Sequence, residues 1–363
     1  MRILLHDYCN DSALLLYGEI LCQYRKVVDT AGLVSTYSVM GDCFRHPRNE
    51  EMILINDEEN RDMDGKGKRL LSFWQDKRLK AICHRLSENG YKIGIAGCTL
   101  PSGMPEHTCL FPNFKEQLLE SDIVLLPLPS LRGGRVAFSE EEMPFSEFIK
   151  MLRTDTVLLT GMLPAECARE AQERGIIVYD YYDSEEVKKR NAVLTAEGAL
   201  SIAMQELPIA LCEARTAVVG CGRIGNALIG MLRALGAEVT ALARRAESLE
   251  GAARMGCKTE LLDEGSLRAL TKGYDVVFTT VPAQIFSREI LCEAGLLPYG
   301  RKTLYVDLSS APGSFDPAAA REYGIRLLWA LSLPGKYAPD SAGIVLADRI
   351  LALLSGKGEE GKA

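Results

Sequence analysis

The feature that most constrains the fold is a glycine-spaced turn in the second half of the chain, Gly220-Cys-Gly222-Arg-Ile-Gly225. A buried apolar run ends directly before this turn, and a helical pattern, Asn226 to Leu235, follows it. In such a strand–turn–helix unit the first glycine permits the tight turn, the second lets the backbone approach a pyrophosphate, and the third allows close helix–strand packing. The free N–H groups at the helix start would face the anion. The pattern therefore predicts a Rossmann unit that binds a nicotinamide dinucleotide through Gly220, Gly222, Arg223, Ile224 and Gly225.

The end of the next strand bears on the choice of cofactor. The strand Glu238–Ala243 ends in Arg244 and Arg245, whereas NAD-specific sites carry an Asp or Glu here for the ribose hydroxyls. Two guanidinium groups can pair with a 2′-phosphate and stack on adenine. The sequence favours NADP, with Arg244 as the main contact because it comes first after the strand. The alternative is that one arginine is only a solvated surface charge.

Two later strands are expected to end beside the nicotinamide. They are Tyr274–Thr280 and Thr303–Asp307, and both finish in small or polar residues, as a crevice outside the strand ends requires. Thr280, Pro282 and Ser309 are predicted to line this crevice. Alternatively, the Thr280 and Ser309 hydroxyls satisfy only local backbone groups.

The first half shows a second alternation of strand and helix. Short apolar runs alternate with helical patterns from Lys68 onward, which implies parallel strands joined by right-handed crossovers. The predicted fold class is α/β, with two doubly wound parallel-sheet domains, the second of them the Rossmann domain. In the first half the predicted strands are 69–74, 91–96, 121–127, 156–160 and 176–179, and the predicted helices are 77–89, 144–152 and 165–174.

The chain is expected to divide into four parts. Residues 1–66 are polar and highly charged toward their end, and we interpret them as a poorly ordered extension or as sequence upstream of a natural start at Met63. Residues 67–194 form the substrate and catalytic domain, and residues 195–335 the Rossmann domain, opened by a long connecting helix over 195–212. Residues 336–363 contain a helix, Pro339 to Leu354, that returns toward the first domain and ends in a frayed tail.

Composition excludes several classes of protein. A net charge of −7 argues against binding to a nucleic-acid backbone, and no apolar run is long enough to span a membrane. The start of the chain lacks the apolar core of a secretion signal, so a cytoplasmic protein is expected. The 11 cysteines include no CxxC pair, and we interpret most of them as buried hydrophobes in a reducing compartment, with no metal site.

The position of the histidines limits the chemistry. All four histidines precede residue 108, so none follows the glycine turn. This removes the usual arrangement of D-hydroxy acid dehydrogenases, in which a histidine takes the hydroxyl proton. No GxSxG, HExxH or P-loop pattern is present either. The oxidation should therefore need little proton abstraction from oxygen, or use Glu, Lys or Tyr.

Several segments carry a resemblance to a known family. From about Lys68 to Leu354 the chain resembles the A subunit of dipicolinate synthase, the dehydrogenase component of the enzyme in spore-forming bacteria, and the first 66 residues fall outside this resemblance. It implies NADP-linked oxidation of a dihydropyridine dicarboxylate to pyridine-2,6-dicarboxylate, and a flavoprotein-like partner as the second subunit; a homo-oligomer is also expected. The carrying segments are Asn191-Ala-Val-Leu-Thr-Ala-Glu-Gly198, Gly220–Gly225, Ala243-Arg244, Asp307-Leu-Ser-Ser-Ala-Pro-Gly313 and Leu333-Pro-Gly-Lys-Tyr-Ala-Pro-Asp-Ser-Ala-Gly343.

This chemistry indicates which kinds of residue the site requires. Aromatisation supplies driving force, so the enzyme mainly has to hold the hydride donor carbon against the nicotinamide. Glu197 is the predicted proton acceptor, or else it orients Lys336; alternatively it is a first-turn helix acid stabilised by the dipole. A dicarboxylate also requires cations. The predicted catalytic residues are Glu197, Lys336 and Arg132, and the predicted substrate-binding residues are Arg78, Arg132, Arg135, Thr195 and Lys336.

Some positions depart from the family pattern. Leu194 stands where a proline is usual, and Ala311 where a basic residue is common, which puts a carboxylate contact there in doubt. The first strand leads into Ser72-Phe-Trp-Gln-Asp76 rather than a glycine-rich turn. Two other functions stay open: another NADP-dependent oxidoreductase of a small imine or keto acid, and a non-catalytic NADP-binding sensor.

Overall fold

The structure is a computed structural model that describes residues 67–73, 76–96, 102–111, 114–137, 142–296 and 303–356. The predicted extension, residues 1–66, lies outside the described residues, and so does the tail beyond residue 356. The chain divides into the units 1–59 and 60–363, and all described residues belong to the second unit.

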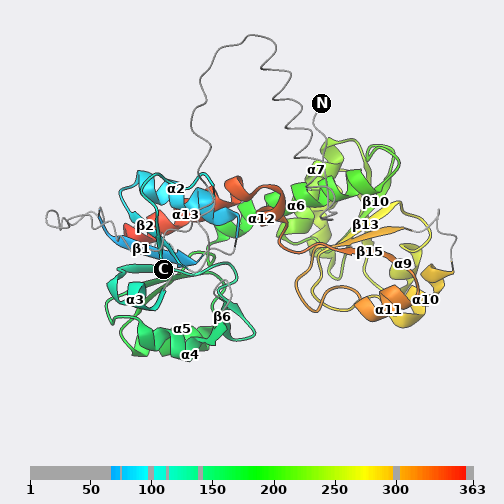
Figure 1. Ribbon diagram of the computed structural model, residues 1–363. Coiled ribbons are helices and arrows are strands. Elements are labelled where there is room, and N and C mark those ends of the chain that lie inside the picture. Colours follow the sequence, from blue (N-terminus) through cyan, green and yellow to red (C-terminus); the bar gives the residue numbers. More distant parts are fainter. Residues whose placement is uncertain are drawn as a thin grey trace, which may run out of the picture. The chain divides into compact units, whose positions relative to one another are not determined.

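The first sheet has six parallel strands, in the order β3-β2-β1-β4-β8-β9 (Figure 1). Its central strands are almost entirely buried, as expected for a parallel sheet covered by helices on both faces. The strands are β1 (Arg69–Phe73), β2 (Lys92–Ala96), β3 (Cys109–Phe111), β4 (Ile123–Leu125), β8 (Val157–Thr160) and β9 (Ile177–Asp180), and the helices are α2 (Arg78–Glu88), α3 (Phe114–Glu120), α4 (Phe145–Phe148), the short 3-10 helix η1 (Ile149–Met151) and α5 (Ala165–Glu173).

A small antiparallel sheet stands where only a loop was expected. It consists of β5 (Leu131–Arg132), β6 (Arg135–Ala137) and β7 (Glu142–Pro144), inserted between β4 and β8. Gly133 and Gly134 join β5 to β6 with φ values of 56° and 76°, and two consecutive positive φ angles suit a two-residue hairpin turn. Strand β3 and helix α3 were also not predicted.

The second sheet repeats the same strand order, as β12-β11-β10-β13-β14-β15, again all parallel. The prediction of two parallel-sheet α/β parts, the second Rossmann-like, is confirmed. Its strands are β10 (Arg215–Val219), β11 (Glu238–Ala243), β12 (Lys258–Leu261), β13 (Val276–Thr279), β14 (Leu304–Asp307) and β15 (Arg326–Trp329), and its helices are α7 (Arg223–Ala234), η2 (Ala246–Leu249), α8 (Glu250–Arg254), α9 (Glu264–Ala269), α10 (Arg288–Gly295) and α11 (Pro317–Glu322).

The long helix between the sheets, α6 (Glu185–Glu206), begins ten residues before the predicted start at Thr195. Ser184 caps it by accepting a hydrogen bond from the backbone N–H of Val187. The early turns are charged and mostly exposed, so the apolar pattern did not reveal them. The helix ends before Cys212 because Leu207, which precedes a proline, adopts an extended backbone.

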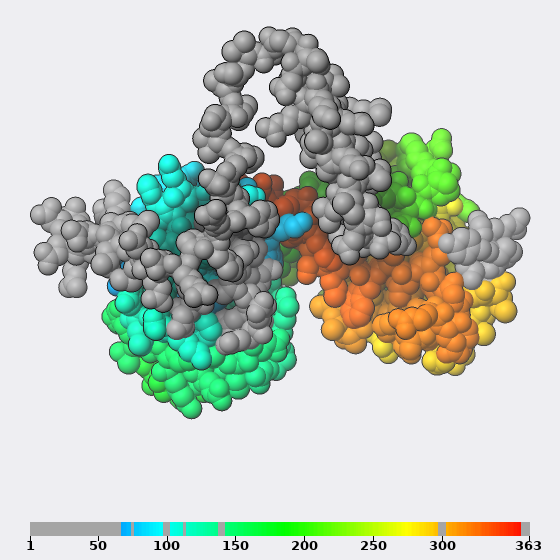
Figure 2. Space-filling view, viewed as in Figure 1, coloured from blue at the N-terminus to red at the C-terminus, as the bar shows by residue number. Residues whose placement is uncertain are grey.

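Two C-terminal helices, α12 (Leu333–Tyr337) and α13 (Pro339–Leu354), complete the described chain. Helix α13 follows the second sheet in sequence, yet it packs on α2 and shares one core with the first sheet. A side chain at Gly343 would come within 2.5 Å of the Arg78 carbonyl oxygen, so the two helices approach closely. Figure 2 shows part of α13, in red, at the surface beside the blue and cyan atoms of the first sheet.

Candidate dinucleotide site and its surroundings

The glycine turn after β10 is closed on one side and open on the other. Gly220 has a φ of 100°, and a Cβ there would lie 2.4 Å from the Thr280 hydroxyl. A Cβ at Gly225 would lie only 1.8 Å from the Gly220 carbonyl oxygen, whereas one at Gly222 would meet nothing within 4 Å. Gly222, at the N-cap of α7, supplies no side-chain cap, so the N–H groups of the first turn remain available to an anion. The turn fits a dinucleotide pyrophosphate.

The crevice residues predicted on the later strands have different roles. The Thr280 hydroxyl lies 3.2 Å from the Val219 carbonyl oxygen and 3.1 Å from that of Gly220, so it holds the glycine turn in place. The Ser309 hydroxyl is buried and donates to Asp307 at 2.6 Å, so it is used within the sheet itself. Pro282 is exposed.

Arg244 and Arg245 lie one strand away from the glycine turn. Strand β11 pairs with β10 so that Leu242 is opposite Val219, which brings the end of β11 beside the turn. Both arginines are exposed. Neither side chain forms a hydrogen bond or ion pair with another described residue, so both guanidinium groups are available to a ligand.

A hollow of about 330 Å³ opens at the glycine turn, against the start of α6. Lys188, Asn191 and Ala192 share one face of α6 because they are three and four residues apart. Lys188, Ala192 and Tyr182 were missed as site residues, and Asn191 was noted only as part of the resemblance; a helix start at Glu185 would have revealed this face. The lining residues are Tyr182, Lys188, Asn191, Ala192, Gly222, Arg223, Ile224 and Thr280.

The two charged residues that line this hollow, Arg223 and Lys188, are both paired with carboxylates. The Arg223 guanidinium donates to both Glu185 oxygens, with Nη2 at 2.7 Å from Oε1 and at 2.8 Å from Oε2. Lys188 Nζ donates to Asp183 at 2.8 Å and lies 3.9 Å from Glu185. The hydrogen bond from Arg223 holds the pKa of Glu185 below its usual value, and the bond to Asp183 raises the pKa of Lys188. Both shifts favour the charged forms of Glu185 and Lys188.

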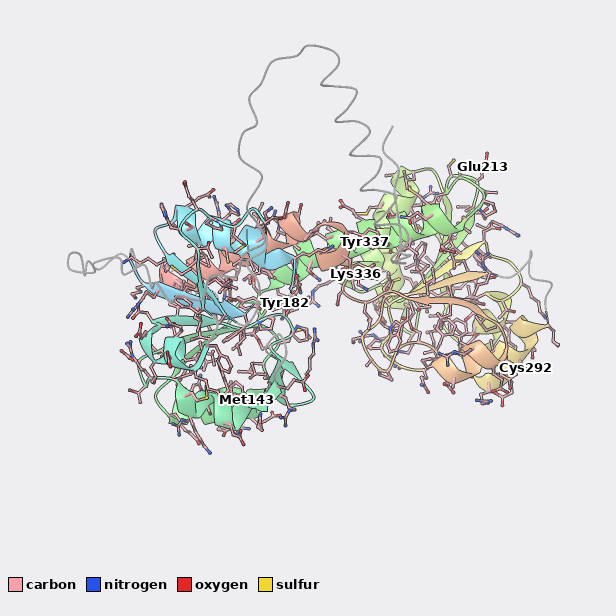
Figure 3. All side chains as sticks on the ribbon, in the orientation of Figure 1. Met143, Tyr182, Glu213, Cys292, Lys336 and Tyr337 are labelled. Carbon is pink, nitrogen blue, oxygen red and sulfur yellow. The ribbon has the colours of Figure 1, made fainter. Side chains whose placement is uncertain are left out.

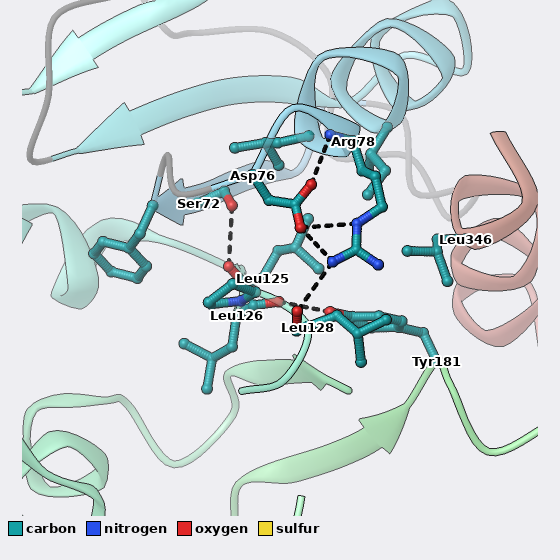
Figure 4. A pocket seen from close by; sticks show the side chains of 12 residues that line it. Ser72, Asp76, Arg78, Leu125, Leu126, Leu128, Tyr181 and Leu346 are labelled. Carbon is teal, nitrogen blue, oxygen red and sulfur yellow. Dashed lines mark hydrogen bonds and ion pairs between the residues drawn. The ribbon is translucent and has the colours of Figure 1, made fainter. Parts of the chain in front are cut away.

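The corresponding end of the first sheet is filled by side chains (Figure 4). Arg78 is buried, and its guanidinium bonds to the Asp76 carboxylate, with Nε 2.8 Å from Oδ2, and to the Leu128 carbonyl oxygen at 3.0 Å. The Tyr181 hydroxyl donates to Leu126 at 2.9 Å, and burial raises its pKa. Only about 20 Å³ remains open to the centre of a water molecule. Arg78, predicted as a substrate cation, is thus already paired.

The remaining first-domain cations lie on the small hairpin. Arg135 is half-exposed; its guanidinium donates to the Glu142 carbonyl oxygen at 2.8 Å and lies 3.8 Å from the carboxylate. Arg132 is exposed, and its side chain has no ion pair with any described residue. Of these two predicted substrate cations, only Arg132 is uncompensated.

The other predicted site residues lie on α6 and α12. The Thr195 hydroxyl is buried and donates to the Asn191 carbonyl oxygen at 2.8 Å. Glu197 is exposed and follows Lys188 by nine residues, which is two and a half turns, so it faces the opposite side of α6 from the hollow. The alternative of a first-turn acid is wrong, because Glu197 lies in the helix interior. Lys336 is exposed on α12 (Figure 3).

The described part of the chain contains neither a metal-binding cluster nor a membrane-spanning helix. No cluster of three or more His, Cys, Asp or Glu side chains there could hold a metal ion. None of its helices has the length and apolarity needed to cross a membrane.

Comparisons with known proteins agree with this architecture. Residues 76–182 match the family described as the N-terminal domain of the dipicolinate synthase A subunit, and residues 184–309 match the NAD-binding domain of D-isomer-specific 2-hydroxyacid dehydrogenases. The A subunit of dipicolinate synthase from Bacillus subtilis is 30% identical over 294 residues, covering 79% of this chain and 96% of that protein.

Two solved structures are also similar to the chain. The crystal structure of the dipicolinate synthase A subunit from Bacillus halodurans is 27% identical, with a TM-score of 0.69, and the match covers 80% of this chain and 98% of that one. The crystal structure of the corresponding B. subtilis protein is also 27% identical, with a TM-score of 0.67 and coverages of 81% and 98%.

Proposed function

This chain belongs to the family of dipicolinate synthase A subunits, and from that premise we propose that it oxidises a dihydrodipicolinate to pyridine-2,6-dicarboxylate during sporulation, using NADP. The family supports a dehydrogenase role, and the second sheet carries a dinucleotide-binding domain of the NAD(P) type. The observation that carries the proposal is the glycine turn at the reversal of strand order in the second sheet, where α/β proteins bind dinucleotides.

The cofactor would be held by the turn and its neighbours. Gly220, Gly222 and Gly225 leave the backbone open to the pyrophosphate, and Arg223 and Ile224 begin the helix that faces it. Thr280 keeps the turn in shape and, with Pro282 and Ser309, belongs to the strand ends beside the nicotinamide. Bound there, the nicotinamide supplies a hydride acceptor.

NADP is proposed over NAD because of the charges after β11. Arg244 and Arg245 are exposed, uncompensated and next to the glycine turn, so they suit a 2′-phosphate. The matched dehydrogenase family is described as NAD-binding, but that description covers many members, and this chain has Ala243 where an acidic residue would hold the ribose hydroxyls of NAD.

The substrate carries two carboxylates and loses a hydride and a proton. Arg132 and Lys336 are exposed cations that we propose bind the carboxylates. Arg135, opposite Arg132 in the hairpin, and Thr195, on the same face of α6 as Lys188, complete the proposed substrate-binding set. Glu197 and Lys336 are the proposed groups for the proton. Arg78 is paired with Asp76, so we propose that it supports this region rather than contacting substrate.

A partner protein also belongs to the proposal. The relatives are named as A subunits of a synthase, which supports the existence of a different second subunit. We propose that this partner is flavoprotein-like, and that copies of the present chain also form a homo-oligomer.

The direct test is an assay of the purified chain with NADP and freshly prepared dihydrodipicolinate, with and without a candidate second subunit. We expect the absorbance of reduced nicotinamide to rise, and Lys336→Met to raise the KM for the diacid without changing the Kd for NADP. Lys272→Met, at an exposed lysine in the turn between α9 and β13, is the matched control and should behave as wild type. No reduction of NADP under either condition would refute the substrate assignment.

A further inference from the structure

We propose that Glu185 is an internal competitor of the dinucleotide: its carboxylate occupies the Arg223 guanidinium until the cofactor pyrophosphate displaces it. Glu185 therefore sets the affinity for the cofactor without touching it. The inference rests on the proposed function only in that a dinucleotide binds at the glycine turn.

The position of Arg223 makes it a phosphate ligand. Arg223 is the first residue of α7 and directly follows Gly222, so its backbone N–H belongs to the turn that faces the pyrophosphate. A planar guanidinium binds phosphate and carboxylate oxygens through the same pair of parallel N–H donors. One anion can hold these donors at a time.

Glu185 now holds those donors. Nε and Nη2 of Arg223 lie 3.1 Å and 2.8 Å from Glu185 Oε2, and Nη2 also lies 2.7 Å from Oε1. Arg223 lines the hollow at Gly222, and Glu185 is hydrogen-bonded to its guanidinium. A carboxylate in this place mimics one anionic oxygen pair of a pyrophosphate.

The exchange requires little free energy from the protein. The two side chains are 50% and 62% exposed, and an ion pair in that setting is weak because water screens both charges. A released Glu185 also has a second cation nearby, since Lys188 lies 3.9 Å away on the next turn of α6. Pyrophosphate can therefore take Arg223 while Glu185 remains near a positive charge.

A neighbouring residue offers a matched control. Glu186 is exposed on the same first turn of α6 and has no ion pair among the described side chains. Glu186→Gln removes the same charge from the same helix start, so it reproduces the loss of favourable interaction with the helix dipole. Any difference from Glu185→Gln then reports the contact with Arg223.

The experiment is a fluorescence titration of the full chain with NADPH, at low and at high salt. Glu185→Gln should lower the Kd about threefold to fivefold, as expected for release of an exposed ion pair, while Glu186→Gln should match wild type. Arg223→Gln should raise the Kd about tenfold, and Glu185→Gln should then give no further gain in the double variant. The gain should shrink at high salt.

The outcomes separate the two proposals. Equal Kd values for Glu185→Gln and Glu186→Gln, or an undiminished gain in the Arg223→Gln background, would overturn the competition while leaving the dinucleotide site intact. Wild-type protein that binds no dinucleotide at all would overturn the proposed function and this inference with it.

Discussion

The chain leaves β1 of the first sheet and β10 of the second sheet through different residues. The first sheet passes from β1 to α2 through Asp76 and Arg78, whose ion pair fills the space at the strand ends. The second passes from β10 to α7 through Gly220, Gly222 and Gly225, and the same place there is open. Since the strand order is identical in both sheets, topology cannot be the cause of this difference.

The comparison separates what a fold provides from what side chains decide. A reversal of strand order leaves a crevice at the carboxyl ends of the two central strands. The guanidinium of Arg78 and the carboxylate of Asp76 close that crevice in the first sheet. In the second sheet glycines, which have no side chains, keep it open. Function therefore resides in the residues placed on the fold, and not in the fold itself.

The largest effect is expected when the Arg78–Asp76 ion pair of the first sheet is removed. Arg78→Met should lower the free energy of unfolding by about 3–5 kcal/mol, because it leaves the Asp76 carboxylate without its cation. Asp76→Asn combined with Arg78→Met should recover much of this loss. Arg69→Met, which removes an exposed pair with Glu120, should cost well under about 1 kcal/mol. Chemical denaturation measures all of these; equal costs for Arg78→Met and Arg69→Met would contradict the role of the buried pair in closing the crevice.

The second test adds a side chain to the glycine turn after β10. Gly225→Ala should destabilise the protein by about 1–3 kcal/mol and raise the NADPH Kd at least about tenfold, because a Cβ there would meet the Gly220 carbonyl oxygen at 1.8 Å. Gly230→Ala, in the same helix and with open space around its Cβ, should stabilise α7 slightly. Thermal unfolding and titration report both effects. If Gly225→Ala bound NADPH as tightly as wild type, the close packing of the turn would not matter for binding.

The third test concerns which dinucleotide, NADP or NAD, the open site of the second sheet binds. Arg244→Ala should raise the Kd for NADPH about tenfold to hundredfold through the lost charge-assisted hydrogen bonds, and leave the Kd for NADH nearly unchanged. Arg254→Ala removes an exposed charge at the end of α8 and serves as the control. Equal losses for both cofactors would remove the assignment of Arg244 to the 2′-phosphate.

The last test concerns the buried thiol of Cys83 on α2. Burial raises the pKa of Cys83 from 9.0 to about 12, so folding favours its protonated form. The unfolded chain loses this proton at lower pH than the folded chain. The contribution of Cys83 to the free energy of unfolding should therefore be fully present below pH 9 and be lost as the pH rises toward 12. Cys83→Ala should flatten this fall by up to about 1.4 kcal/mol per pH unit, measured by urea unfolding. Cys292→Ala, at an exposed position, is the control for removal of a thiol.

Much of this fold was predictable because buried parallel strands have a clear apolar pattern. Strand β8 is an apolar run ending in threonine between two helical patterns, and the glycine turn identified the second sheet directly. The β5–β6 hairpin was missed because its strands are only two and three residues long, although the paired glycines between them were a usable signal.

The site was less predictable, because pairing depends on distant residues. Nothing local to Arg78 shows that Leu128, fifty positions later, accepts from its guanidinium. Lys188 escaped notice because the start of α6 was placed at Thr195 and not at Glu185. Both failures concern charged residues, whose partners are set by tertiary structure, whereas apolar periodicity is set by the element that carries it.

The packing of α13 on α2 has a consequence for how the protein is made. Val345, Leu346 and Ile350 share a core with Leu79 and Ile82, which the ribosome produces more than 250 residues earlier. A nascent chain that has emerged only as far as β15 therefore lacks one wall of its first core. Contacts this distant in sequence form late, so the portion synthesised first is the portion finished last, and a chaperone would find exposed apolar surface on it until translation ends.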